Sequence, residues 1–231
     1  MNLSSKERDM TAASLSALPV PAALAQHVDE TISLYVIREA ALRRSAMTLD
    51  GLRRLDDRLA AHLDGVWIAA RKGWQVGEVG ESPEPGSIFM ATINAVEGRD
   101  EAGLAALIDH SQAHVDARRA LVAACGWMEK ATLQGVVVHL LRDRAAFARM
   151  LGIAACAVHR VDPGLMTAGY LRDPAVPPRA RALRAAGELG HAELLPACVA
   201  ALDEDDPEIA FWAAWSAVLL GNRGRAVRAR V

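Results

Sequence analysis

The chain has 231 residues, of which 52% are hydrophobic, 23% charged and only 4% aromatic, and its formal net charge is −2. So small a net charge excludes an overall field that would hold nucleic acid or an anionic membrane. Frequent alanine and scarce aromatic residues favour closely packed helices over a β-rich fold, so we expect an all-α protein.

The first 26 residues are predicted to form a disordered tail. Residues 10–25 carry no charge, follow two basic residues and end in Ala23-Leu24-Ala25, a small-x-small pattern typical of a signal-peptide cleavage site. Polar residues and two prolines interrupt this stretch, so a cytoplasmic protein is the favoured interpretation and a periplasmic one the alternative. No run reaches the roughly 18 apolar residues that a membrane span needs, and we expect no membrane partner.

Residues 27–80 are predicted to form an N-terminal helical hairpin. Its first helix begins at Asp29, a good N-cap residue, and runs to about Ser45. The core candidates in that helix are Ile32, Tyr35, Val36 and Leu42. The second helix covers residues 50–71, where apolar residues three and four apart lie opposite a charged face. Residues 81–86 contain two prolines and two glutamates, and we expect them to be a connector.

Residues 87–231 contain a repeat of 31 residues. The step connects the pairs Ala123-Ala124, Ala154-Ala155, Ala185-Ala186 and Ser216-Ala217, and it also connects Gly190 with Gly221. A constant period of this size with two helices per unit is the signature of an α-solenoid. We predict a degenerate first repeat over 87–112, with Ser87 as the N-cap of its first helix. After it we predict first helices near 116–128, 145–159, 178–189 and 208–220, and second helices near 131–142, 163–172 and 191–202.

Two further patterns fit this repeat. Three Asp-Pro steps, at 162–163, 173–174 and 206–207, are predicted to start helices, because aspartate caps a helix and proline suits its first turn. Cys125 and Cys156 occupy the same position of consecutive repeats, and Gly187 follows in that position. We therefore expect a small buried packing site there, rather than a redox or metal-binding role.

The stretch RALRAAGELGHAELLPACVAALDEDDP, residues 181–207, resembles bacterial HEAT-like repeats, in which a small-residue helix, a glycine, a second helix and an acidic turn recur. This resemblance covers about residues 87–221 and implies a right-handed α-solenoid of HEAT-like helical-hairpin repeats.

A second resemblance concerns LDDRLAAHLDG, residues 55–65, followed by Gly73-Trp74. This stretch is similar to the N-terminal signature of an uncharacterised bacterial HEAT-repeat family encoded among type VI secretion genes. The resemblance implies a non-catalytic scaffold that binds a protein, as an immunity, adaptor or accessory protein for a secreted effector or toxin. Members of that family are considerably longer than this chain, which implies a further C-terminal part.

The partner is expected to bind the second helices, which line the concave surface of a solenoid. The candidate residues, whose side chains we expect to point outward from these helices, are His139, Arg142, Tyr170, Arg172 and Glu193. Trp212 and Trp215 are further candidates, because between Ile209 and Leu220 only Ser216 is polar, whereas a terminal repeat normally turns a polar side to water. This predicts self-association, a bound protein or a missing continuation at that end.

The alternative function is a nucleic-acid-binding enzyme on the same scaffold, such as a relative of the HEAT-like alkylpurine DNA glycosylases. A stripe of arginines would follow a phosphate backbone in such a protein. The arginines concerned are Arg142, Arg144, Arg149, Arg160, Arg172, Arg179, Arg181 and Arg184. Trp127, Trp212 and Trp215 lie in first helices, which usually pack away from the concave face, so a solvated arginine face is favoured.

Histidines supply the remaining candidates for chemistry. His110 and His114 have the spacing of metal ligands, with Asp109 and Asp116 nearby, but no third ligand stands in register, so solvent-facing side chains are favoured. His62 lies beside an apolar stripe, where a structural role is favoured over catalysis. Nucleophile-elbow and phosphate-binding glycine motifs do not occur. We therefore expect no catalytic residue, no metal and no cofactor.

Overall fold

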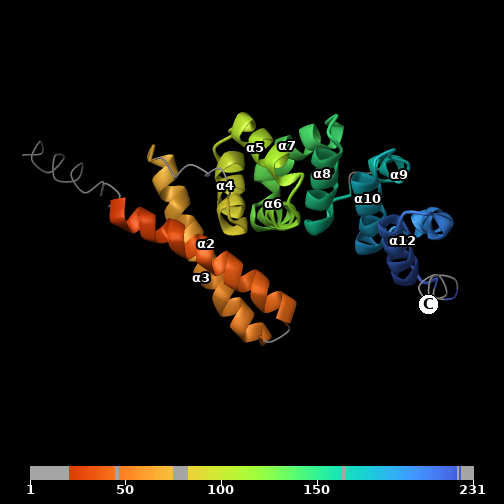
Figure 1. Ribbon diagram of the computed structural model, residues 1–231, viewed down its shortest axis with the longest axis horizontal. Helices are drawn as coiled ribbons and strands as arrows, with labels where there is room; N and C mark the ends of the chain where they lie inside the picture. The colour runs from red at the N-terminus through yellow and green to blue at the C-terminus, as the bar shows by residue number, and fades with distance from the viewer. Residues whose placement is uncertain (1–20, 45–46, 75–82, 163–164, 223, 225–231) are drawn as a thin grey trace, which may run out of the picture. The chain divides into compact units, whose positions relative to one another are not determined.

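The computed structural model describes residues 21–44, 47–74, 83–162, 165–222 and 224. All regular elements in these ranges are helices and none is a strand, which confirms the predicted all-α class. None of the helices in the described ranges is both long enough and apolar enough to cross a membrane. The chain divides into two compact units, Met1–Ser82 and Pro83–Val231 (Figure 1).

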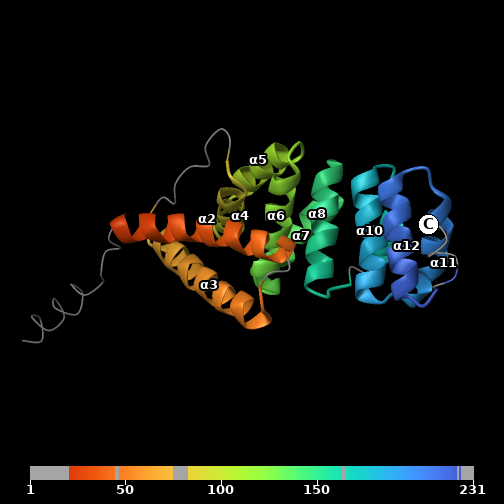
Figure 2. The ribbon, with the colours of Figure 1, turned by 60° about the horizontal axis from the view of Figure 1, so that its bottom comes forward.

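The first unit consists of helices α2 (Pro21–Arg44) and α3 (Leu49–Arg71), which pack against each other in opposite directions (Figure 2). Its centre is apolar, and Leu34, Tyr35, Leu59 and Val66 are at most 2% exposed. Helix α3 begins where it does because the Thr48 hydroxyl accepts a hydrogen bond of 3.1 Å from the Gly51 amide.

Helix α2 differs from the prediction in its start and in its buried face. It begins at Pro21 rather than after Asp29, so residues 21–26 are helical and only residues 1–20 of the expected tail lie outside the described ranges. Alanines favour helix, and Leu24 is buried. Two of the core candidates are wrong, since Val36 is 43% and Leu42 is 47% exposed. Tyr35 is buried as predicted, and Leu34 beside it takes the second central position.

The second unit contains two kinds of helix. The first helices are α4 (Pro85–Glu97), α6 (Val115–Trp127), α8 (Ala146–Val158), α10 (Val176–Leu189) and α12 (Pro207–Leu219). The second helices are α5 (Glu101–Ser111), α7 (Lys130–Arg142), α9 (Leu165–Tyr170) and α11 (Leu195–Ala200), with short 3₁₀ turns η1 (Ala192–Leu194) and η2 (Ala201–Asp203) on either side of α11. Each first helix packs against the next one along the chain (Figures 1 and 2).

Two element boundaries in this unit depart from the expected ones. Helix α4 starts inside the expected connector, with Glu84 rather than Ser87 as its N-cap, because Pro85 is already set for a first helical turn. The predicted second helix at 191–202 is interrupted, since Pro196 has no amide hydrogen to continue the hydrogen-bond ladder from the turn before it.

The small-residue positions of the repeat lie where consecutive first helices meet. Helices α6, α8, α10 and α12 begin at Val115, Ala146, Val176 and Pro207, so their starts are 30 or 31 residues apart. Ala124, Ala155, Ala186 and Ala217, taken from the four registers, are at most 1% exposed. At Ala186 and Ala217, which are fully buried, a residue larger than alanine would have to displace its neighbours.

Most first helices also end in the same way. The residues that follow α4, α8, α10 and α12 include one with positive φ, namely Arg99, Arg160, Gly190 and Gly221. The next amide donates to a carbonyl five residues back, as in the 3.0 Å bond from His191 to Ala186 and the 2.8 Å bond from Asn222 to Ala217. This is the Schellman helix end, in which glycine adopts the left-handed conformation without steric cost.

The starts of three first helices share an aspartate. The carboxylates of Asp143, Asp173 and Asp206 each accept a hydrogen bond from the amide two residues further on, at 2.7, 2.9 and 2.9 Å. Asp206 is the N-cap of α12 and Pro207 lies in its first turn, as predicted. Asp173 is not an N-cap, since Ala175 holds that position in α10, and Pro163 lies outside the described ranges.

The cysteines occupy packing sites, as expected. Cys125, Cys156 and Cys198 are buried and unpaired. Burial raises the pKa of Cys125 to about 12, although a backbone hydrogen bond opposes the shift, and it raises the pKa of Cys198 to about 11. At Gly187, a Cβ atom would lie 2.6 Å from Ser216 Oγ, so a larger residue there would have to displace Ser216.

Candidate functional site

A groove runs between α5 and α7 on the second unit. Its volume is about 680 Å³. We call it the α5–α7 groove, and its lining residues are Val96, Glu97, Arg99, Glu101, Leu104, Ala105, Ile108, Ala131, Thr132, Gly135, Val136, His139, Leu140 and Asp143. The groove therefore draws on the end of α4, the turn that follows it, and one face of each second helix.

The groove combines an apolar floor with a charged rim. Leu104, Ile108 and Leu140 are buried below it, each at most 8% exposed. The rim carries three carboxylates, from Glu97, Glu101 and Asp143, against the single guanidinium of Arg99, with His139 beside them. This excess of acidic groups favours a ligand that brings positive charge.

Gly135 leaves part of the α5–α7 groove open. A glycine inside a helix costs about 1 kcal/mol relative to alanine, so its presence there requires another reason. A Cβ atom added at Gly135 would meet nothing within 4 Å, and Gly135 lines the groove. The glycine thus keeps free a space that larger side chains would otherwise fill.

A second, smaller groove lies on the opposite side of α7. Its volume is about 430 Å³, and apolar residues of α7 and α8 line most of it, including Leu133, Val137 and Cys156. His159 at its edge is held by a contact of 2.7 Å between its Nε2 atom and the carbonyl oxygen of Cys125. Helix α7 therefore presents side chains to two adjoining grooves.

The predicted second-helix residues do not all face outward. His139 lines the α5–α7 groove, and Arg142 and Arg172 are exposed near the ends of α7 and α9. The outward orientation predicted for Tyr170 is wrong, because its side chain is half-buried and its hydroxyl donates to the carbonyl oxygen of Leu141. Burial raises the pKa of Tyr170, which keeps this hydroxyl protonated as a donor.

The other predicted residues lie towards the C-terminal end of the unit. Glu193 in η1 is exposed, and its carboxylate is 2.9 Å from His191 Nδ1. On α12, Trp212 and Trp215 are half-buried with ring centroids 5.5 Å apart, and the Arg184 guanidinium lies 4.5 Å above the Trp212 ring. The tryptophans are therefore partly covered by their own chain.

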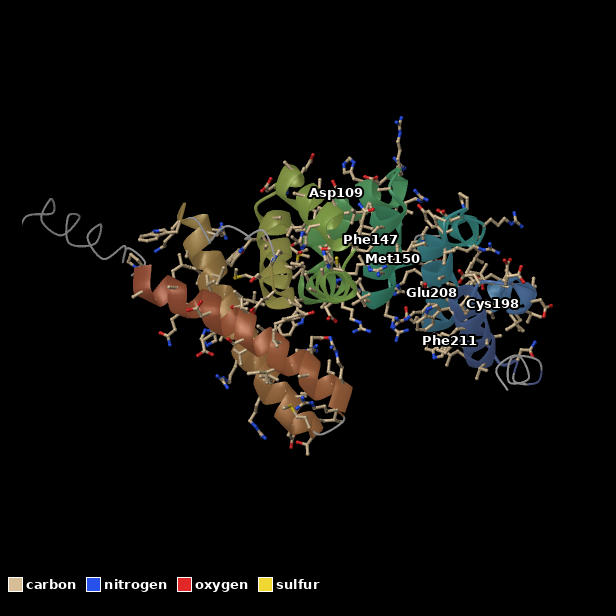
Figure 3. All side chains as sticks on the ribbon, in the orientation of Figure 1. Asp109, Phe147, Met150, Cys198, Glu208 and Phe211 are labelled. Atoms are coloured by element: carbon tan, nitrogen blue, oxygen red, sulfur yellow. The ribbon has the colours of Figure 1, made fainter. Side chains whose placement is uncertain are left out.

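The outer side of α12 nevertheless remains apolar. Phe211, labelled in Figure 3, is 41% exposed, and Leu219 is 53% exposed. Ser216, the single polar residue between Ile209 and Leu220, points inward and donates a 2.6 Å hydrogen bond to the carbonyl oxygen of Leu183. Residues 225–231 lie outside the described ranges.

Sequence reasoning missed the acidic rim and the glycine of the α5–α7 groove. The rim residues are far apart in the chain, and each looks like an ordinary solvated charge, so no local pattern groups them. Gly135 was the available signal, because it stands in the middle of a helix that continues beyond it. At His110 and His114 the rings are stacked with centroids 5.2 Å apart, and the described ranges hold no cluster of three metal-ligating side chains.

In comparisons with known proteins, no protein-family model, no curated protein and no solved structure matches the chain.

Proposed function

We propose that residues 83–231 form a right-handed α-solenoid of HEAT-like repeats and that the protein is a non-catalytic scaffold that binds another protein. Three observations support the architecture. The first helices start 30 or 31 residues apart, they pack in succession through buried alanines, and four of the five end with a left-handed residue. In solenoids of this type the second helices provide the binding surface.

The α5–α7 groove is the observation that carries the functional proposal. Its volume of about 680 Å³ is ample for several side chains of a partner. An apolar floor inside a polar rim is the usual anatomy of a protein interface. Because the rim is acidic, the bound segment is one with apolar residues flanked by lysine or arginine.

The biological setting follows from the resemblance of residues 55–65. In that setting the protein is cytoplasmic and serves as an immunity or adaptor protein for a type VI secretion effector. An immunity protein would cover the effector's active surface, and an adaptor would escort it to the secretion apparatus. A toxin or effector encoded next to this chain would support either role.

The arrangement of the arginines favours a protein ligand over a nucleic acid. Arg149 binds Asp173, Arg179 binds Glu204, and both Arg181 and Arg184 bind Glu188. Arg160 donates to the carbonyl oxygen of Glu188. Five of the eight arginines that would have formed a phosphate-binding stripe are thus engaged within the protein, which weakens the glycosylase alternative.

Changing polar residues that line the α5–α7 groove is expected to reduce partner capture. The variant combines Glu97→Ala, Glu101→Ala and His139→Ala, which remove two carboxylates and an imidazole from the rim, and none of the three side chains is buried, so the fold should be unaffected. The matched control, Arg119→Ala, changes an exposed residue of the first helix α6. Tagged protein is used to capture partners from cells of the source organism, and the bound proteins are identified by mass spectrometry.

The proposal requires one protein that both the native chain and the control retain and that the triple variant loses. Capture that survives the triple variant but fails with Arg119→Ala would place the partner on the first helices instead. If the retained ligand is nucleic acid, with affinity falling steeply as salt rises, the glycosylase alternative takes its place.

The apolar side of α12 is expected to make the purified protein self-associate. Replacing Phe211 and Leu219 with glutamate puts charge on the two most exposed large apolar positions of this helix. Light scattering should give a mass above the 24.7 kDa of one chain for the native protein and the monomer mass for this variant. The control Leu49→Glu, at a residue 85% exposed in the first unit, should still associate. A monomeric native protein would contradict the expectation.

A further inference from the structure

Two histidines face each other across the hairpin of the first unit. His27 lies in the second turn of α2 and His62 lies in α3, and their Nδ1 atoms are 3.1 Å apart. The ring centroids are 5.1 Å apart with an angle of 62° between the planes, and both side chains are half-buried. The Nδ1 atoms of two imidazoles therefore meet at the interface of the two helices.

Gly65 in α3 creates the space that brings these rings together. A Cβ atom at this position would lie 2.7 to 2.8 Å from three atoms of the His27 ring, closer than real Cβ contacts allow. Glycine inside a helix costs about 1 kcal/mol relative to alanine, and here it lets an imidazole lie against the helix backbone. His62 and Gly65 both belong to the LDDRLAAHLDG stretch, so this stretch supplies one imidazole and also the glycine against which the other imidazole packs.

We propose that His27 and His62 form a two-histidine chelating site for a divalent transition-metal ion that favours imidazole, such as Zn²⁺. Two nitrogens bound to one tetrahedral Zn²⁺ at about 2.0 to 2.1 Å lie about 3.3 Å apart, close to the separation found. Without metal, the Nδ1 atom of one ring carries a proton and donates a hydrogen bond to the Nδ1 atom of the other ring. On binding, that proton moves to Nε2 of the same ring, both Nδ1 lone pairs face the metal, and no proton is released.

The remaining coordination positions belong to water. Within the described ranges no third histidine, cysteine, aspartate or glutamate joins the pair. One turn away at the same interface, Glu30 lies 3.6 Å from Arg58. A bound ion would link α2 to α3 and thereby stabilise the hairpin.

Calorimetric titration of tag-free, full-length protein with ZnCl₂ tests the proposal. The native chain should bind one equivalent of Zn²⁺ through this pair. His27→Asn and His62→Asn should each weaken this binding by more than about 100-fold, because each removes a ligand. The double variant His110→Asn with His114→Asn, at the other neighbouring histidine pair, should bind as the native chain does.

Gly65→Ala provides a test that keeps both imidazoles and improves helix propensity. The added methyl group displaces the His27 ring, so Zn²⁺ affinity should fall about tenfold or more although the helical signal in circular dichroism is retained. Absence of Zn²⁺ binding in the native chain would overturn the proposal. Unchanged affinity in His27→Asn, in His62→Asn or in Gly65→Ala would also overturn it, as would loss of the site in the His110 and His114 double variant.

Discussion

Replacing Arg149 with alanine is expected to lower the free energy of unfolding of the second unit by about 3 kcal/mol at neutral pH. The guanidinium makes two hydrogen bonds to the Asp173 carboxylate, of 2.8 and 2.9 Å, and two more to the carbonyl oxygens of Asp143 and Arg144. The Arg149 and Asp173 side chains are only 16% and 6% exposed. Alanine would therefore leave a buried carboxylate without its partner.

The effect of this substitution should depend on pH. Burial alone would raise the pKa of Asp173, but hydrogen bonds from Arg149 and from the Ala175 amide outweigh it and hold the pKa below its ordinary value. The ion pair therefore contributes its full stability above about pH 4 and loses it as the pH falls through the lowered pKa. The stability difference between native protein and variant should be largest near neutrality and should shrink below about pH 4.

Urea unfolding of both proteins at several pH values measures this difference. The matched control is Arg119→Ala, which breaks an ion pair with Asp116 whose side chains are 57% and 54% exposed, and it should change stability by less than about 1 kcal/mol. Equal losses at the buried and the exposed pair, or a loss at Arg149 that is independent of pH, would contradict the assigned role.

Enlarging the repeated alanines is the second change with a large expected effect. Ala186→Leu should destabilise the protein by about 3 kcal/mol, because this fully buried residue of α10 belongs to the core shared with α12. Ala155→Leu should cost less, about 1 kcal/mol, because Ala155 also borders the apolar groove between α7 and α8, into which a longer side chain can extend.

Thermal melting and urea unfolding compare these variants with Ala102→Leu, at an exposed position of α5. The control should be nearly neutral. If both core variants have the same melting temperature as the native protein, the repeated alanines do not lie at the contacts between helices, and the repeat is wrongly placed.

The helical class and most helix boundaries of the second unit were predictable because they depend on local signals. Alanine-rich segments, the glycines at 190 and 221 and the aspartate at 206 act within a few residues of their own position. Left-handed residues at Arg99 and Arg160 could not be foreseen, since only the packing of the surrounding helices holds arginine in that conformation.

Features that depend on residues far apart in the chain were missed, because no local signal reports them. Helix α2 extends back to Pro21, where Leu24 is buried although the composition of that stretch suggested a tail. Asp173 appeared to be a helix cap, but its main partner, Arg149, lies 24 residues earlier in the chain. The orientation of Tyr170 likewise depends on the end of α7, to which its hydroxyl donates.

Binding in the α5–α7 groove is tested most directly by a substitution that fills the groove with a side chain of the protein itself. Gly135→Trp places a large side chain where a Cβ atom meets nothing within 4 Å, so the fold should be retained, and Gly135→Ala is the matched control. The measurement is the affinity, by isothermal titration, of the protein that the native chain captures. If the partner binds in the groove, Gly135→Trp should weaken the affinity for this protein by about 30-fold or more, and Gly135→Ala should leave the affinity unchanged. Equal affinity for the native chain and Gly135→Trp would show that the partner binds elsewhere.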